Sequence, residues 1–142
     1  METNEKTWVT VEATVKTSAD KAWEAWNGPE HIIHWNFASD DWHCPAANSD
    51  LRVGGAFGAT MAAKDGSMSF EFGGVYDIVE PAKKLAYTMG DGRRVEVTFD
   101  QQGEQTHIVE RFEAEGMHPV EFQKAGWQAI LNNYVKYTES LK

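Results

Sequence analysis

The residues best suited to chemistry are histidines and a cysteine in the first third of the chain. His31 and His34 are three residues apart, and His43 and Cys44 follow shortly after them. Four such groups can hold zinc, but the spacing lacks the HExxH pattern that sets two histidines and a general base on one helix face. Adjacent strand residues point to opposite faces, so His43 is poorly placed to activate Cys44. We predict no metal, no cofactor and no catalytic residue here.

Glu110 and Arg111 are the second candidates for chemistry, because a carboxylate or guanidinium inside an apolar cavity can orient a polar ligand group or activate water. If Ile108 and Phe112 point into the core, strand alternation turns Glu110 inward with them. Arg111 would then face outward. The reverse parity, which would cover Val109, stays open. Our preferred interpretation is that these charges are solvated at the edge of the sheet.

Aromatic side chains are the most informative group in the sequence. The chain has six Trp, seven Phe and four Tyr, a heavy load for 142 residues. Most of these rings must fill a core. A surplus would line a cavity, where Tyr hydroxyls and Trp N–H groups supply a few polar contacts.

Charge and composition exclude several classes of partner. The net charge is −9, and Lys83-Lys84 and Arg93-Arg94 are the only basic pairs. Nucleic acid and anionic membranes both need a basic surface, so we predict neither as a partner. No apolar run approaches the roughly 20 residues that span a bilayer. The single cysteine excludes an internal disulfide, and the start METNEKTWVT lacks the apolar stretch of a signal peptide, so we expect a cytoplasmic protein.

The elements that would position these residues follow from periodicity and turn residues. Apolar residues alternate over 7–15, which predicts a strand. Ser18 is placed to cap a short helix that stops at Asn27-Gly28. Pro29 begins a second short helix over PEHIIHWN (29–36), which Ile32, Ile33 and Trp35 would anchor. Further strand patterns cover residues 41–45, 56–63, 67–81, 85–89, 95–99 and 106–114.

The segment 67–81 has the pattern of one strand with an irregularity inside it. The same parity is shared by Phe70, Phe72, Tyr76 and Ile78, so we expect them on one face. The pair Gly73-Gly74 predicts a sharp bend or a close approach of neighbouring backbones.

The last segment, residues 119–141, is different. It has no proline after Pro119 and only one glycine, Gly126, and its apolar residues recur at three- and four-residue steps. This pattern predicts one amphipathic helix of about 20 residues, roughly 30 Å long.

An antiparallel sheet with one apolar face and a helix with one apolar stripe bury both when the sheet curves around the helix. We therefore predict an α+β fold, with residues 1–142 as a single domain. A sheet of six or seven strands would wrap the long C-terminal helix, and two short helices after the first strand would close one end. A strongly curved sheet leaves a gap that side chains need not fill, so we expect a cavity.

Three runs of sequence point to a known family: LRVGGAF (51–57), FEFGGVYDIVEPAKKLAYT (70–88) and GWQAILNNYVKYTESL (126–141). They resemble the bacterial Hsp90-ATPase-activator-like proteins, which are named after the C-terminal domain of a eukaryotic co-chaperone. The family belongs to the START, polyketide-cyclase and Bet v 1-like superfamily of helix-grip folds. The resemblance spans essentially the whole chain and implies that fold. The resemblance implies several possible functions, because the superfamily includes lipid carriers, hydrolases and cyclases.

The family geometry and the strand parity together place most aromatic residues on the concave side of the sheet. The predicted ligand-binding residues are Trp35, Trp42, Phe57, Phe70, Phe72, Tyr76, Tyr87, Glu110, Arg111, Trp127, Leu131 and Tyr134.

Three functions stay open. We prefer a binding module that holds a small, largely apolar or aromatic molecule between the sheet and the C-terminal helix. One alternative is a cyclase- or hydrolase-type enzyme that uses Glu110, Arg111 or a histidine in the same cavity. The other is a protein-interaction domain acting on a chaperone. A deep cavity with a buried, perturbed carboxylate would favour the enzyme, and a filled core with an exposed apolar patch would favour the interaction domain.

Overall fold

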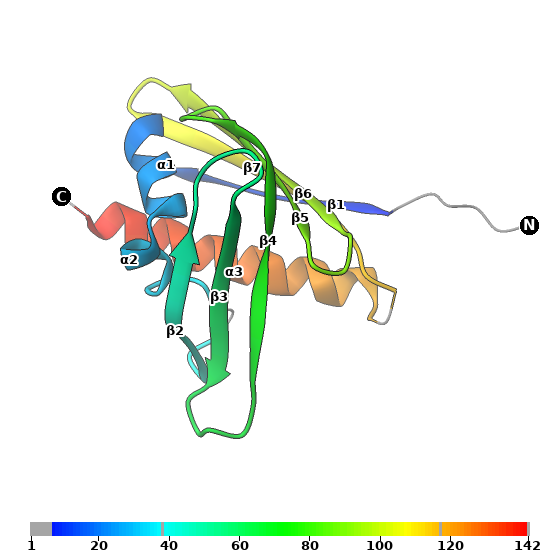
Figure 1. Ribbon diagram of the computed structural model, residues 1–142. Helices are drawn as coiled ribbons and strands as arrows, with labels where there is room; N and C mark the ends of the chain where they lie inside the picture. Colours follow the sequence, from blue (N-terminus) through cyan, green and yellow to red (C-terminus); the bar gives the residue numbers. More distant parts are fainter. Residues whose placement is uncertain (1–6, 38, 117, 142) are drawn as a thin grey trace, which may run out of the picture.

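The computed structural model describes residues 7–37, 39–116 and 118–141. Figure 1 shows one curved sheet with the longest helix lying across its concave side. The strands are β1 (Trp8–Val15), β2 (Trp42–Ser49), β3 (Ala56–Ala63), β4 (Ser69–Glu80), β5 (Lys84–Met89), β6 (Arg94–Gln102) and β7 (Gln105–Glu113). The helices are α1 (Ala19–Asn27), α2 (Pro29–Ile32) and α3 (Val120–Ser140).

The sheet is antiparallel throughout, and its seven strands follow the order β1-β7-β6-β5-β4-β3-β2. Strands β2 to β7 form a meander. The first strand, β1, pairs with the last strand, β7, and Val11 lies opposite Glu110. This arrangement confirms the predicted α+β helix-grip fold, including the single long C-terminal helix. The structure also shows which residues of β7 point into the core, a question that the sequence left open. The buried residues are Ile108, Glu110 and Phe112.

The short helices begin where the sequence predicts. Ser18 caps α1, and its Oγ accepts a hydrogen bond from the backbone N of Lys21 at 3.3 Å. Helix α2 begins at Pro29 but ends after one turn, earlier than its apolar pattern suggested. The chain then turns so that Trp35 is buried, and the indole N–H of Trp35 donates to the carbonyl of Ala25 at 3.0 Å.

Strand β4 contains a bulge that reverses its alternation. Between Tyr76 and Ile78, β4 advances by two residues while β5 advances by one. Asp77 is therefore the extra residue, and Ile78 does not share the concave face of Tyr76. The prediction that both lie on one face was wrong, because a bulge leaves no mark in a simple alternation pattern. Val79 packs against the core instead.

Gly73 and Gly74 lie where neighbouring backbones come too close for a side chain. A Cβ atom on Gly73 would lie 2.4 Å from the carbonyl oxygen of Phe57, and one on Gly74 would lie 2.3 Å from that of Thr88. The predicted close approach is confirmed, and a larger residue at either position would push the strands apart.

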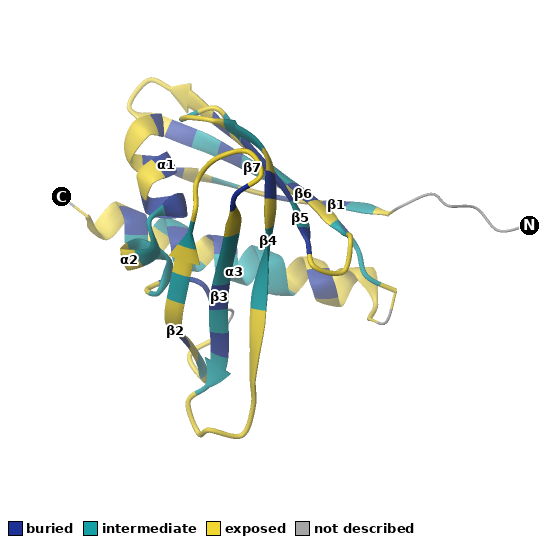
Figure 2. Ribbon diagram, viewed as in Figure 1, coloured by how far each residue is buried: buried dark blue, intermediate teal, exposed yellow. Residues whose placement is uncertain are grey.

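Burial follows the concave face of the sheet and the side of α3 that faces it (Figure 2). One end of this interior is filled by aromatic rings. They come from α1, from the loop that follows α2, from β6 and from α3. Tyr134 packs edge-on against Trp26, with ring centroids 4.8 Å apart, and against Trp35 at 5.2 Å. Trp23 and Trp26 both contact Phe99. We call this region the packed end.

Candidate ligand-binding cavity

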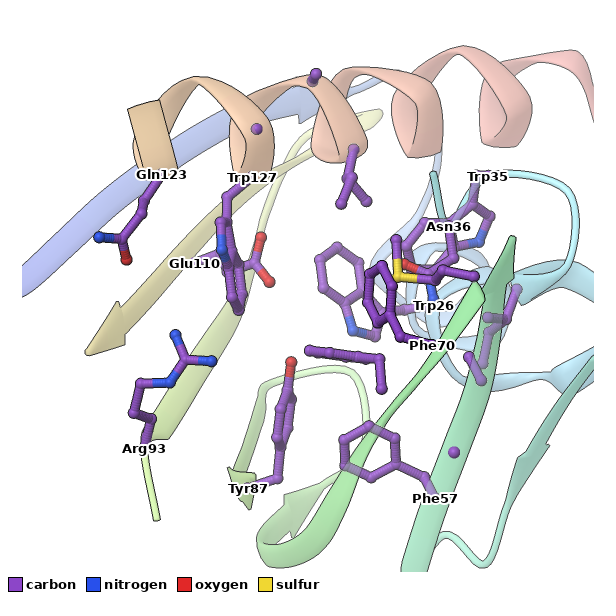
Figure 3. Close-up of a pocket in the computed structure, with 18 of the residues that line it drawn as sticks. Trp26, Trp35, Asn36, Phe57, Phe70, Tyr87, Arg93, Glu110, Gln123 and Trp127 are labelled. Atoms are coloured by element: carbon purple, nitrogen blue, oxygen red, sulfur yellow. The ribbon is translucent and has the colours of Figure 1, made fainter. Parts of the chain in front are cut away.

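Beyond the packed end, side chains do not completely fill the space between the sheet and α3. A cavity of about 640 Å³ lies between the first half of α3 and the concave faces of β3, β4, β5 and β7 (Figure 3). Two lining residues are exposed and mark an opening to solvent: His118 just before α3 and Phe122 in its first turn. Ala125, Gly126 and Ala129 of α3 line the cavity and, being small, leave room between the helix and the sheet.

Eight of the twelve predicted ligand-binding residues line this cavity and four do not. Those that line it are Trp35, Phe57, Phe70, Phe72, Tyr76, Tyr87, Glu110 and Trp127. Those that lie elsewhere are Trp42, Arg111, Leu131 and Tyr134.

The four residues outside the cavity have other surroundings. Arg111 lies on the outer face of the sheet, where its guanidinium is 4.8 Å from the ring of Trp8 and 3.3 Å from a carboxylate oxygen of Glu96. Leu131 and Tyr134 are buried in the core. Trp42 of β2 contacts Phe70 at 5.8 Å between ring centroids but does not reach the cavity.

Phe57 is the centre of an aromatic wall on the sheet side. Its ring stacks on Tyr76 with centroids 5.0 Å apart and meets Tyr87 edge-on at 4.6 Å. On the helix side, Trp127 stacks on Phe112 with centroids 3.9 Å apart and planes 10° apart, and it touches Phe72 at 6.2 Å. Such walls offer a flat or fatty molecule contact on two sides.

Glu110 is the main departure from this apolar lining. Only 6% of the residue is exposed, and its carboxylate makes no hydrogen bond or ion pair with any described residue. Removal from water raises the pKa of Glu110 from the usual 4.5 to about 8, so that the carboxyl is largely neutral at pH 7. The interpretation of Glu110 as a solvated charge was therefore wrong.

Tyr87 and Arg93 share this part of the cavity with Glu110 (Figure 3). The Tyr87 hydroxyl makes no hydrogen bond to the described residues, and burial together with the nearby Glu110 raises its pKa well above 10. Arg93 belongs to the turn between β5 and β6, and its Nε donates to Oδ2 of Asp91 at 2.7 Å. The remaining guanidinium nitrogens point into the cavity.

Sequence reasoning missed Arg93 and Gln123. For Arg93 the signal was the Asp91-Gly92 turn, in which an aspartate two residues earlier can hold the arginine. For Gln123 it was a polar residue on the buried side of a helix. Gln123 is buried, and its side chain bonds the backbone of Glu115 and His118 at 2.8–3.1 Å, which fixes the loop before α3.

The histidine and cysteine residues of the first third are spread over different surroundings. Nδ1 of His31 lies 2.7 Å from the Tyr137 hydroxyl, His34 stacks on Tyr137, and Cys44 is buried on β2. Among the described residues, no three His, Cys, Asp or Glu side chains form a group that could hold a metal ion. The absence of a metal stays a prediction.

A curved seven-stranded sheet around a long C-terminal helix, with a cavity between them, defines a helix-grip protein. Residues 16–139 match the model of the family described as "Activator of Hsp90 ATPase homolog 1-like protein". The chain belongs to this family. None of the described helices is long and apolar enough to cross a membrane.

Solved structures from bacteria resemble the chain over nearly its full length. The solution structure of the AHSA1-like protein from Aeromonas hydrophila is 42% identical, with a TM-score of 0.89 over 94% of this chain and 93% of that one. The protein Chr148 from Cytophaga hutchinsonii is 54% identical, with a TM-score of 0.79 over 92% and 91%. Protein CV1439 from Chromobacterium violaceum shares the fold at 20% identity, with a TM-score of 0.84 over 94% and 98%. A search of curated proteins found no match.

Proposed function

We propose that the protein binds a small, largely apolar or aromatic molecule in the cavity between the sheet and α3. The observation that carries this proposal is the unfilled, aromatic-lined volume of about 640 Å³, which falls inside the usual range of roughly 300–1,000 Å³ for ligand pockets. A ligand that enters this space displaces water from aromatic walls that give that water few hydrogen bonds, which favours an apolar molecule.

The lining supports an apolar ligand with few polar atoms. Phe57, Phe72 and Trp127 supply ring faces and edges, and Ala129 leaves room beside them. A ligand in this position would lose most of its contact with water, which contributes roughly 25 cal/mol for each Å² of apolar surface buried.

An enzymatic function is the second candidate, and one observation favours it. Glu110 is a buried carboxyl in a cavity, and a pKa near 8 suits a group that gives and takes protons at neutral pH. Arg111, which the enzyme hypothesis also named, lies outside the cavity. His118, at the opening, is the only histidine among the described lining residues.

Interaction with a chaperone is the third candidate, and its support is the family description together with the exposed ring of Phe122, which is 66% exposed. This function was predicted to come with a filled core. The cavity therefore supports small-molecule binding better than it supports interaction with a chaperone.

The cavity can be tested by filling it. Ala129→Leu should place its new atoms in empty space, so the melting temperature should hold or rise while naphthalene binding weakens at least tenfold. Binding is measured by amide chemical shifts during titration. Lys124→Leu is the matched control, because Lys124 lies exposed on the same helix and does not line the cavity.

In wild type, naphthalene should shift amides of β3, β4, β5 and the first half of α3. If neither naphthalene nor its substituted analogues shift these residues, the proposal fails. If Lys124→Leu weakens binding as much as Ala129→Leu does, the ligand binds somewhere other than this cavity.

A further inference from the structure

Three polar side chains that could bond a ligand lie on one side of the cavity. Glu110 from β7, Tyr87 from β5 and Arg93 from the β5–β6 turn lie on one side of the cavity, while Trp26, Trp35 and Asn36 border the other side (Figure 3). A ligand that fills the cavity therefore meets these three groups with one of its sides.

The three polar groups have unused hydrogen-bonding capacity. The hydroxyl of Tyr87 and the carboxyl of Glu110 make no hydrogen bond with the described residues, and Arg93 uses only its Nε, on Asp91. These groups face the accessible space of the cavity, so a ligand there can become their hydrogen-bonding partner.

The surroundings of Glu110 determine which partner fits. The titratable groups lining the cavity are Tyr76, Tyr87, Arg93, and Glu115 and His118 at the opening. The part of α3 that lines the cavity contributes no charged residue. No cation is bonded to Glu110, so burial keeps its carboxyl protonated near neutral pH, and a protonated carboxyl offers an O–H donor.

In that state all three groups are donors: the Tyr87 hydroxyl, the Glu110 carboxyl and the Arg93 guanidinium. We propose that this side of the cavity selects ligands that carry a hydrogen-bond-accepting oxygen, a carbonyl or a carboxylate, on an apolar or aromatic body. The inference rests on the proposed binding function. A ligand with an ammonium group is disfavoured, because the guanidinium of Arg93 brings a positive charge to the same space.

The test compares probes that share a naphthalene body and differ in one substituent. The probes are 2-acetylnaphthalene, 2-isopropylnaphthalene, which matches its shape without the oxygen, 2-naphthoate, and 1-(2-naphthyl)ethylamine. Dissociation constants come from amide-shift titrations at pH 7. We expect the acetyl compound to bind about tenfold more tightly than the isopropyl compound, as one or two net hydrogen bonds provide.

Variants assign this preference to residues. Tyr87→Phe and Arg93→Met should each reduce the preference for the acetyl compound severalfold, and Arg93→Met should weaken 2-naphthoate most. Arg111→Met is the matched control, because Arg111 lies on the outer face, and it should leave all four constants unchanged.

The pH dependence separates a donor from an acceptor at Glu110. Affinity for 2-acetylnaphthalene should fall as the pH rises through about 8, where Glu110 ionises. Glu110→Gln keeps an N–H donor at every pH, so its affinity should stay level. The inference is overturned if the isopropyl compound binds as tightly as the acetyl compound, or if the amine binds best and gains affinity with rising pH. If no probe binds at all, the proposed function itself fails.

Discussion

Helix α3 crosses two regions of the same sheet that are built in opposite ways. At the packed end its second half contributes Tyr134, whose ring meets Trp26 and Trp35 edge-on. At the hollow end its first half contributes Ala125 and Ala129 beside a cavity of about 640 Å³. The packed end is filled by rings from α1 and from the loop after α2 as well as from α3, and the hollow end has small residues of α3 where such rings would be needed.

The two regions also differ in how polar groups are treated. At the packed end the Tyr134 hydroxyl donates to the carbonyl of Ala22 at 2.6 Å, and the indole N–H of Trp35 donates to Ala25. At the hollow end Tyr87 and Glu110 have no such partner among the described residues. Thr138 Oγ1, buried in the second half of α3, is an exception, because it has no hydrogen-bond partner in the described part of the chain. Polar groups bonded to the protein are typical of a structural core, whereas Tyr87 and Glu110 face the cavity and can bond a ligand.

The largest expected effect comes from Glu110 and depends on pH. Between pH 4.5 and 8 the unfolded chain releases a proton that folded Glu110 retains, so the free energy of unfolding falls as the pH rises. The loss is complete above about pH 8 and is on the order of 5 kcal/mol at about 1.4 kcal/mol per pKa unit. Glu110→Gln should remove it, and urea unfolding at pH 5, 7 and 9 measures the difference.

Glu104→Gln is the control for this experiment. Glu104 is exposed in the turn between β6 and β7, so its replacement should leave the wild-type pH slope unchanged. Equal slopes for wild type and Glu110→Gln would mean that Glu110 is well solvated in the folded protein.

The second prediction compares one aromatic residue from each end. Tyr134→Ala should lower the free energy of unfolding by about 4 kcal/mol, because the side chain is fully buried and truncation leaves a new void. Trp127→Ala should cost only about 2 kcal/mol, because this larger ring is half-buried beside an existing cavity. Urea unfolding at pH 7 checks both. A larger loss for Trp127→Ala would show that the hollow end is not hollow in solution.

The sequence predicted the elements well because their signals are local. The alternation over 7–15, the cap at Ser18 and the unbroken periodicity of 119–141 each depend on neighbouring residues, and each element formed where it was expected. The bulge at Asp77 was missed, because it depends on how β4 and β5 pair.

The cavity was harder to predict because it depends on distant residues. Glu110 has the local pattern of a half-exposed strand residue, and the space that it faces is formed by residues far apart in the sequence, from β3, β4, β5 and α3. Arg111 and Arg93 show the same difficulty. Arg111 lies on the outer face by strand parity, whereas Arg93 reaches the cavity because a tight turn folds its side chain back onto Asp91.

The smallest expected effect is a gain in stability at Gly126, which lies inside α3 where the helix faces the cavity. A Cβ atom there would meet no other atom within 4 Å, so Gly126→Ala should raise the free energy of unfolding by about 0.5–1 kcal/mol through reduced backbone entropy of the unfolded chain. Gly74→Ala is the contrasting variant and should lower it, because its Cβ would lie 2.3 Å from the carbonyl oxygen of Thr88. Thermal unfolding resolves both signs. If Gly126→Ala destabilises the protein, α3 lies closer to the sheet than the cavity allows, and the contrast between the two ends no longer holds.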